Sequence, residues 1–224
     1  MTAVFITSTG TGIGKTFLTA GLVRYFRDHA RSVDAYKPVI SGFDPAAPQE
    51  SDSGLILSAL GRGLTEAEID RISPWRFAAP LSPNMAARME GRQISFEALV
   101  THSSACASAA DIVLIEGVGG IMVPLDEQHT VLDWMLAIRL PTLLVVGSYL
   151  GTISHTLSAL DVLWHRGLQV RAIVVDESLD SSVPFEDTVA TIKQFAQQTE
   201  VIALPRLDGA YHNHPAFAQL GQRL

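Results

Sequence analysis

The chain has little of three things: cysteine, basic residues and long apolar runs. Cys106 is the only cysteine, so no intrachain disulfide can form, and this fits the reducing cytoplasm. It lies in a run of small residues, which is typical of a packed helix position rather than of a nucleophile. Sixteen Lys and Arg stand against 23 Asp and Glu, for a formal net charge of −7. This balance argues against a nucleic-acid surface, which needs clustered cations.

Extended apolar stretches are also absent. The apolar run at 143–146 is the size of a strand and far shorter than the ~18 residues of a membrane-spanning helix. The first ten residues lack the basic segment of a signal peptide. We therefore expect a cytoplasmic protein that binds neither a membrane nor a nucleic acid.

Short apolar runs rich in β-branched residues alternate with longer amphipathic ones. Because the short runs are continuously apolar, they predict strands that are covered on both faces. The 224 residues, 47% of them hydrophobic, suit one compact domain. We predict a single α/β domain over 1–224, with a mostly parallel sheet and helices on both faces. Strands are predicted at 4–6, 33–36, 111–115, 143–146, 170–175 and 201–204, and helices at 15–29, 95–109, 154–165 and 185–198.

The segment between residues 38 and 95 has a different character. It holds five prolines and shows no strand pattern, only short helical pieces near 53–60 and 65–72. An insertion of this length, about 42–94, is usually functional in a compact domain. The tail at 208–224 stays unassigned, and His212-Asn213-His214 within it is predicted to be surface rather than a metal site.

A glycine-rich loop joins the first strand to the first helix, with the sequence Ser8-Thr9-Gly10-Thr11-Gly12-Ile13-Gly14-Lys15-Thr16. Gly-Lys-Thr at such a junction ends a P-loop, in which backbone N–H groups wrap the phosphates, Lys15 reaches the β- and γ-oxygens and Thr16 binds Mg²⁺. The helix N-terminus adds partial positive charge. The strict pattern has glycine where Thr9 stands. Three glycines within five residues still favour phosphate binding over an ordinary glycine turn, and the fold class becomes P-loop NTPase-like.

Further segments carry a resemblance to a known family. They are Tyr36-Lys37-Pro38-Val39-Ile40-Ser41-Gly42, Ser51-Asp52, Phe77-Ala78-Ala79-Pro80-Leu81-Ser82-Pro83, Glu116-Gly117-Val118-Gly119-Gly120, Pro124-Leu125 and Leu150-Gly151-Thr152-Ile153-Ser154-His155. With the loop at 8–16, they make the chain resemble the dethiobiotin synthetases from residue 3 to about 207. The combination of Lys-Pro-Val-x-Ser-Gly with Glu-Gly-x-Gly-Gly is specific, whereas a lone P-loop is not.

The resemblance implies a ligase of biotin biosynthesis. The family converts 7,8-diaminopelargonic acid, CO2 and ATP into dethiobiotin, ADP and phosphate. One amine takes up CO2 as a carbamate, the carbamate attacks the γ-phosphate, and the second amine closes a ureido ring. ATP is then a co-substrate and Mg²⁺ the cofactor.

Lys15 and Lys37 are the predicted catalytic cations, because phosphoryl transfer depends on positioning and charge stabilisation. Lys37 follows the second strand, at the edge where open parallel sheets collect their ligands. Mg²⁺ prefers hard oxygens, and its predicted ligands are Thr16, Asp52 and Glu116. Glu116 ends a buried strand, where an unpaired carboxylate is costly. Asp52 has an alternative role, capping the helix that begins there.

The resemblance also implies contacts to substrate and nucleotide. Predicted substrate-binding residues are Ser41, Thr11, Gly151, Thr152 and Ser154. Predicted nucleotide-binding residues are Gly12, Ile13, Gly14, Lys15, Thr16, Phe17, Asp52, Glu116, Gly117, Val118, Gly119, Asp176, Pro205, Arg206 and Leu207. In the family the segment at 151–154 belongs to the neighbouring subunit and opens a helix whose N–H groups suit a carboxylate. A homodimer with shared active sites is therefore implied.

Three positions depart from many family members, with Gly12 in place of Glu, Ser154 in place of Asn, and Asp176-Glu177 in place of Asn-Asp. Ionised Asp176 only accepts hydrogen bonds, which suits the two adjacent N–H donors of guanine better than adenine. One hypothesis is a relaxed ATP preference, with GTP a usable donor. The other is that Asp176 points to solvent and the backbone of Pro205–Leu207 reads the base.

Two other functions stay open. One is an amide-forming P-loop relative that acts on another carboxylate or amine. The other is a nucleotide switch that binds ATP and a partner protein. Lys37 with Ser41 favours chemistry, and Gly10 stands where the polymer-moving ATPases of the deviant-Walker class carry a second lysine.

Overall fold

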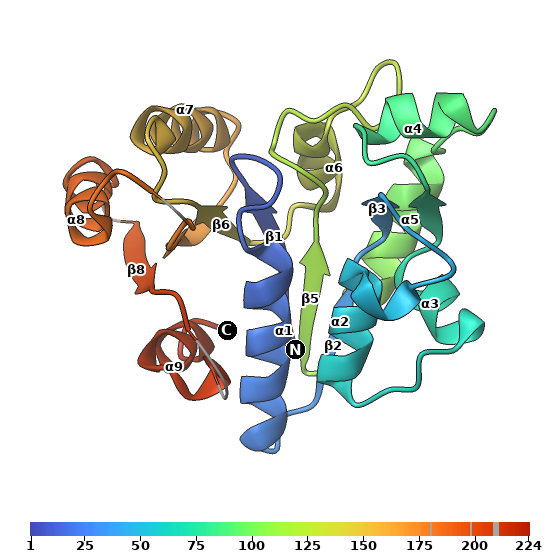
Figure 1. Ribbon diagram of the computed structural model, residues 1–224, viewed down its shortest axis with the longest axis horizontal. Helices are drawn as coiled ribbons and strands as arrows, with labels where there is room; N and C mark the ends of the chain where they lie inside the picture. Colours follow the sequence, from blue (N-terminus) through green and yellow to red (C-terminus); the bar gives the residue numbers. More distant parts are fainter. Residues whose placement is uncertain (180, 198, 208–210) are drawn as a thin grey trace.

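A six-stranded sheet forms the centre of the computed structural model, which describes residues 1–179, 181–197, 199–207 and 211–224 (Figure 1). Its strand order is β2-β5-β1-β6-β7-β8, and each of these pairings is parallel. The strands are β1 (Thr2–Ser8), β2 (Val33–Tyr36), β5 (Ile112–Glu116), β6 (Thr142–Val146), β7 (Val170–Asp176) and β8 (Glu200–Leu204). All six predicted strands and the parallel α/β class are confirmed.

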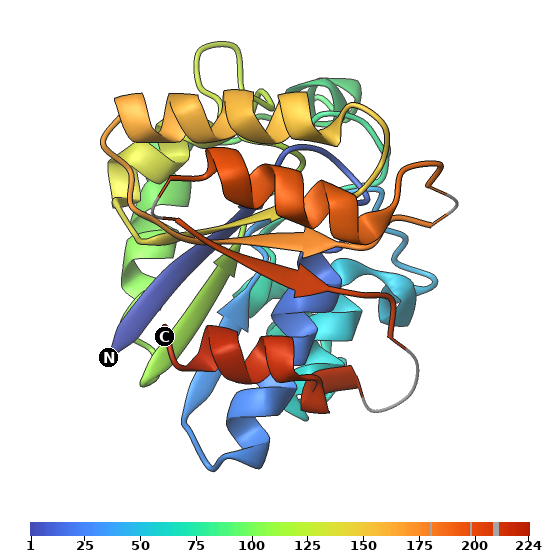
Figure 2. The same cartoon turned by 90° about the vertical axis from the view of Figure 1, so that its left-hand side faces the viewer.

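Helices cover both faces of the sheet, as right-handed crossovers between parallel strands require. In Figure 2, α7 (Thr152–His165) and α8 (Phe185–Phe195) lie on one face, and α1 (Lys15–Asp28) and α9 (Pro215–Gly221) lie on the other. The remaining helices are α2 (Asp52–Leu60), α3 (Glu66–Ile72), α4 (Pro83–Met89), α5 (Phe96–Cys106) and α6 (Val131–Ile138), with 3-10 turns at Pro48–Glu50 and Tyr211–Asn213. Of the helices in the described residues, none has the length and hydropathy that a bilayer crossing needs.

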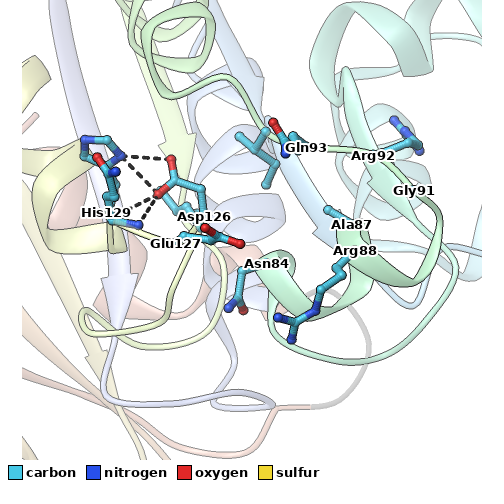
Figure 3. Close-up of a pocket in the computed structure, with 12 residues that line it drawn as sticks. Asn84, Ala87, Arg88, Gly91, Arg92, Gln93, Asp126, Glu127 and His129 are labelled. Carbon is cyan, nitrogen blue, oxygen red and sulfur yellow. Dashed lines mark hydrogen bonds and ion pairs between the residues drawn. The ribbon is translucent and has the colours of Figure 1, made fainter.

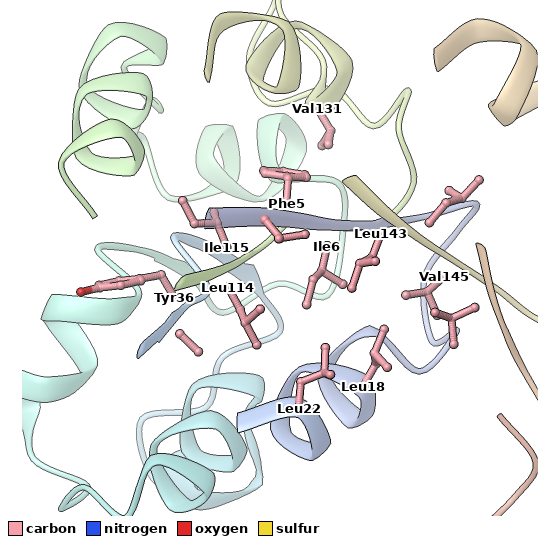
Figure 4. Close-up of a cluster of buried hydrophobic side chains, with 14 of the residues drawn as sticks. Phe5, Ile6, Leu18, Leu22, Tyr36, Leu114, Ile115, Val131, Leu143 and Val145 are labelled. Carbon is pink, nitrogen blue, oxygen red and sulfur yellow. The ribbon is translucent and has the colours of Figure 1, made fainter. Parts of the chain in front are cut away.

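Successive residues of the central strand β1 pack against helices on opposite faces. Phe5 is fully buried and meets Trp134 of α6 edge to face, with ring centroids 4.8 Å apart. Ile6 points the other way, toward Leu18 and Leu22 of α1 (Figure 4). Burying each such side chain stabilises the fold by about 1.5–3 kcal/mol. Because both faces are covered, the strands are continuously apolar, which is why their pattern predicted them.

Two short strands correct the prediction that the segment at 38–95 contains none. β3 (Val39–Ser41) and β4 (Trp75–Phe77) pair in parallel as a separate two-stranded sheet. Each has three residues, too few to show a period. The pairing continues past the strands, because Gly42 N–H donates to Ala79 O at 3.2 Å. It thereby brings the Lys-Pro-Val-x-Ser-Gly motif beside the loop that precedes α4.

The described part of the C-terminal tail forms α9, which packs on α1. Phe217 is fully buried against Gly21, where a Cβ would collide with its ring. His214 Nδ1 accepts from Ala216 N–H at 3.2 Å and caps the helix, while His212 lies 2.9 Å from Asp28. The described residues contain no cluster of three or more potential metal ligands of the His, Cys, Asp and Glu types. The rest of the tail, 208–210, lies outside the described residues.

Candidate active site

The turn between β1 and α1 provides backbone donors for an anion. Ser8 ends β1 and Lys15 begins α1, so residues 9–14 form the turn. Gly12 and Gly14 have φ of 70° and 74°, in the left-handed region that favours glycine. The N–H groups of the first turn of a helix have no partner within it, and they point toward any anion bound there. The strand–loop–helix context that a P-loop requires is therefore present.

Lys15 folds back along this loop. Its Nζ donates to Ser8 Oγ at 2.9 Å and to Gly10 O at 3.1 Å, and the residue is only 6% exposed. Burial, followed by the nearby charge of Lys37, lowers the pKa of Lys15 to about 8, although Glu116 and Asp52 act in the opposite direction. A lysine so poorly solvated is stabilised when an anion such as a phosphate approaches it.

Four side chains from different elements meet beside the loop. Thr16 Oγ1, on α1, lies 2.8 Å from both Asp52 Oδ1 and Glu116 Oε1. Lys37 Nζ donates to Glu116 Oε1 at 2.6 Å and lies 3.2 Å from Asp52 Oδ2. Glu116 is fully buried at the end of β5, and Thr19 donates to its second oxygen at 2.7 Å. The predicted metal ligands and Lys37 are therefore one connected cluster.

The charges of this cluster support one another. Burial alone would lower the pKa of Lys37, but Glu116 and Asp52 raise it above its ordinary value, so the ammonium form persists. Burial alone would raise the pKa of Asp52, but Lys37 and the Thr16 hydroxyl lower it below its usual range. Ser51 caps α2 by accepting from Gly54 N–H, which leaves Asp52 free of the alternative capping role.

The donor set of the cluster fits Mg²⁺. Thr16, Asp52 and Glu116 offer only hydroxyl and carboxylate oxygens, which a hard cation prefers. Two carboxylates are present rather than the three or more of an all-protein cage, and Mg²⁺ usually completes its six ligands with phosphate oxygens and water. The residues therefore fit an ion that arrives together with a nucleotide.

A cavity of about 800 Å³ opens in front of this cluster. Ser41 lines it, and the Ser41 hydroxyl is buried without a hydrogen-bond partner among the described residues. Buried polar groups are rarely left unpaired, so this hydroxyl marks a place for a ligand. The predicted site residues that line the cavity are Thr11, Gly12, Ile13, Gly14, Lys15, Thr16, Phe17, Lys37, Ser41, Asp52, Val118 and Gly119. Pro80 to Pro83 line it as well.

The predicted substrate residues of α7 lie apart from this cavity. Gly151 and Ser154 are exposed, and neither lines it. Thr152 is buried, and its hydroxyl donates to Gly147 O at 2.8 Å. Within one chain the Thr152 hydroxyl therefore stabilises the turn that leads into α7, because Thr152 is the first residue of that helix. This differs from the predicted contact to substrate.

The predicted base-contacting residues gather at the other end of the P-loop. Asp176 ends β7 and lies against Gly14 rather than projecting into solvent. Arg206 N–H donates to Glu177 Oε2 at 2.8 Å, which joins the loop after β8 to the loop after β7. Asp176, Glu177 and Arg206 line a second cavity of about 690 Å³ with Gly12 and Ile13.

The sequence interpretation missed two hydroxyls, those of Ser8 and Thr19. Ser8 accepts from Lys15 and lies 3.0 Å from Gly119 O, and Thr19 holds Glu116. Thr19 stands four residues after Lys15, one helical turn further on, and that spacing was a usable signal. At Gly120 a Cβ would lie 3.0 Å from the backbone of Thr9, so this glycine makes room for the P-loop itself.

A further cavity, of about 440 Å³, contains none of the predicted site residues (Figure 3). It lies between α4 and the loop at 125–129. His129 Nδ1–H donates to Asp126 Oδ2 at 2.8 Å, and the His129 ring stacks on Phe96 at the start of α5. The chemistry described above therefore does not extend into this cavity.

The fold and this site define a P-loop nucleotide-binding protein. The family described as "AAA domain" (AAA_26) matches residues 2–211. The chain is 46% identical over 221 residues to ATP-dependent dethiobiotin synthetase BioD of Phenylobacterium zucineum, covering 97% of this chain and 92% of the relative. It is 47% identical over 190 residues to the enzyme of the same name from Acidiphilium cryptum, covering 84% and 85%. The chain therefore belongs to the family of ATP-dependent dethiobiotin synthetases, as its motifs predicted.

A solved structure supports the fold alone. The MinC:MinD cell division protein complex of Aquifex aeolicus superimposes with a TM-score of 0.57 at 15% identity, covering 95% of this chain and 86% of the other. At this identity the likeness confirms the P-loop arrangement of strands and helices, and carries no statement about activity.

Proposed function

We propose that the chain carboxylates 7,8-diaminopelargonic acid and closes its ureido ring, using ATP and Mg²⁺ and releasing dethiobiotin, ADP and phosphate. The observation that carries this proposal is the meeting of two lysines, two carboxylates and a threonine at one cavity, which also holds the unpaired Ser41 hydroxyl. Family membership at 46% identity supports the same reaction.

The reaction needs charge to be placed and neutralised. An amine of the substrate adds to CO2 and loses a proton, which gives a carbamate. A carbamate oxygen attacks the γ-phosphorus, and the bond from that phosphorus to the ADP oxygen breaks. The second amine then attacks the carbamoyl carbon, loses its proton, and expels phosphate as the ring closes.

The residues of the cluster suit these steps. Lys15 and Lys37 would stabilise negative charge on the phosphoryl oxygens, where preorganised cations contribute most to rate. The Ser41 hydroxyl would hydrogen-bond the carbamate or an amine, which orients it toward the phosphate. Thr16, Asp52 and Glu116 would hold Mg²⁺, which when bound neutralises phosphate charge. Backbone N–H groups of the loop would hold the β-phosphate.

We further propose a cytoplasmic homodimer in which α7 of one subunit completes the site of the other. Gly151 and Ser154 at the start of α7 are exposed, and Leu150 before them is 79% exposed. A helix N-terminus is a ready site for an anion, and the substrate carries a carboxylate. A second copy laid on this face would bring that helix to the open side of a cavity.

The direct test supplies the protein with ATP, Mg²⁺, the diamine and ¹³C-bicarbonate, and follows dethiobiotin by mass spectrometry. We expect product that carries the label in its ureido carbon, with one phosphate released per ring. Omitting the diamine must abolish product, and Lys15→Ala is the matched inactive variant. Phosphate release that does not depend on the diamine, without labelled product, would refute the proposed reaction.

A further inference from the structure

The strand order sets the direction in which a nucleotide lies across the sheet. The P-loop follows the central strand β1, and the Lys37–Glu116 cluster lies on the β5 and β2 side of it. The opposite side holds the carboxyl ends of β7 and β8. With the γ-phosphate at the lysines, the nucleoside extends toward β7 and β8. The polar residues at those two strand ends are then the ones that the base meets.

Asp176 is the carboxyl group placed to meet the base. It is the last residue of β7, it is partly buried, and its carboxylate lies so close to Gly14 that a Cβ there would collide with it. Among the described residues, no group donates a hydrogen bond to this carboxylate, whereas its neighbour Glu177 is engaged by the Arg206 N–H. A half-buried carboxyl group with free hydrogen-bonding capacity, beside the P-loop, is available to a ligand.

Burial, more than the surrounding charges, decides the protonation of Asp176. Burial raises its pKa to about 7, Arg206 acts to lower it, and Glu177 acts to raise it further. The P-loop presents no ionisable side chain here, since Lys15 turns back to Ser8. Tyr149, from the segment between β6 and α7, and His155, in the first turn of α7, line the same cavity and bond to each other at 2.9 Å.

The two forms of a carboxyl group match different purines. A protonated carboxyl donates through O–H and accepts through C=O, which matches the ring nitrogen N1 and the exocyclic N–H₂ of adenine. An ionised carboxylate only accepts, through two parallel oxygens, which matches the N1–H and N2–H₂ donors of guanine. With the wrong base the match fails: the carboxylate sets a lone pair against the lone pair of adenine N1, and the protonated carboxyl sets its O–H donor against an N–H donor of guanine.

We propose that Asp176 reads the nucleobase through its own proton, so that the acid form selects adenine and the carboxylate form selects guanine. This inference rests on the proposed nucleotide site. It makes ATP preference a property of pH in this chain: adenine is favoured below about pH 7, where the acid predominates, and that preference declines above it.

The test measures equilibrium binding of ADP and GDP with Mg²⁺, without diamine, at about pH 6 and about pH 8, on either side of the Asp176 pKa. The phosphates of the two nucleotides titrate alike, so the ratio of the two Kd values isolates the base. We expect the ADP preference of the unmodified chain to fall by about tenfold or more between these pH values, the scale of a charged hydrogen bond. Asp176→Asn keeps shape and has no proton to lose, so its ADP preference should not change with pH.

Two neighbours sharpen the test because they shift the transition in opposite directions. Glu177→Gln removes a negative charge and should move the change in preference to lower pH, while Arg206→Gln removes a positive charge and should move it to higher pH. An ADP-to-GDP ratio that is equal in the unmodified chain and Asp176→Asn at both pH values overturns the inference, although nucleotide still binds. If neither nucleotide binds, the proposed function fails and the inference fails with it.

Discussion

Lys37 illustrates how much of this site is decided at the scale of single residues. Its ammonium lies 2.6 Å from Glu116 and 3.2 Å from Asp52, and the side chain is only 3% exposed. Two carboxylates this close together would repel each other in a poorly solvated place without a cation between them. Lys37 therefore holds the pair together before any ligand arrives, and it is also the cation nearest to the predicted metal ligands.

The first prediction separates these two tasks. Lys37→Ala is expected to fold and bind ADP, but to lose on the order of 10²-fold or more in turnover, as for loss of an electrostatic contact to the transition state. Single-turnover rates with saturating ATP measure the effect, and calorimetry measures ADP binding. Lys193→Ala, at an exposed lysine of α8, is the matched control and should leave both unchanged. Turnover equal to that of the unmodified chain would remove Lys37 from the mechanism.

The second prediction concerns the carboxylates. Glu116→Gln and Asp52→Asn keep the shape of each side chain but replace a carboxylate with an amide, a poorer ligand for a hard dication. Each should raise the Mg²⁺ concentration needed for half-maximal activity by about tenfold, the lower end of the effect for residues around a bound metal. Titrating Mg²⁺ at fixed ATP measures this, with the exposed Glu66→Gln of α3 as control. Identical titrations in both variants would show that the ion is held elsewhere.

At the scale of elements, predictability followed burial. Strands β1, β5 and β6 are covered on both faces, so every residue in the run Ile112–Glu116 is buried and the pattern stands out in the sequence. β3 and β4 gain their stability from pairing with each other across some 35 residues, and no local period records that. Helix α6 was not among the predicted helices, although Thr130 and Asp133 form a capping box that marks its start in the sequence.

Part of the site could be predicted because its residues lie at the ends of regular elements. Lys15, Thr16 and Glu116 stand at strand-to-helix junctions, where position along the chain fixes position in space. Asp52 begins α2 within the inserted segment, away from the central sheet, and only its motif predicted it beside Lys37. Ser8 was unremarkable in sequence because its role depends on Gly119, which lies 111 positions away and approaches only in the folded chain.

The third prediction tests an element that the sequence did not assign. α9 rests on α1 through Phe217, which is fully buried. Phe217→Ala should lower the free energy of unfolding by about 3–5 kcal/mol, the usual range for deleting a buried ring. Denaturant unfolding followed by circular dichroism measures this. Phe195→Ala, at a phenylalanine of α8 that is 54% exposed, is the matched control, and its effect should be at most about 1 kcal/mol. If Phe217→Ala lowered the free energy of unfolding as little as Phe195→Ala, α9 would not support the fold.

At the scale of the whole molecule, one apolar surface is exposed among the described residues. Met122 is 59% exposed and Leu150 is 79% exposed, and a cavity of about 520 Å³ runs between residues 120–124 and α7. These features adjoin the exposed start of α7, so the surface proposed to meet a second copy and the turn proposed to bind its substrate are continuous.

The last prediction follows from that continuity. If α7 completes the site of a second copy, light scattering should report a dimer at catalytic concentrations. Ser154→Trp should then raise KM for the diamine much more than KM for ATP, because the indole would fill the space for the substrate carboxylate and leave the P-loop untouched. Ser58→Trp, at an exposed serine of α2 on the other face of the sheet, is the control for bulk alone and should change neither constant.

Mixing Ser154→Trp with Lys37→Ala makes the test sharper. If each site is built from two subunits, one site of a mixed dimer contains both substitutions and the other site contains neither. Recovery of activity on mixing is therefore expected, up to about a quarter of the normal sites by random pairing of subunits. An active monomer, or a mixture with no recovery, would show that each chain binds its substrate alone.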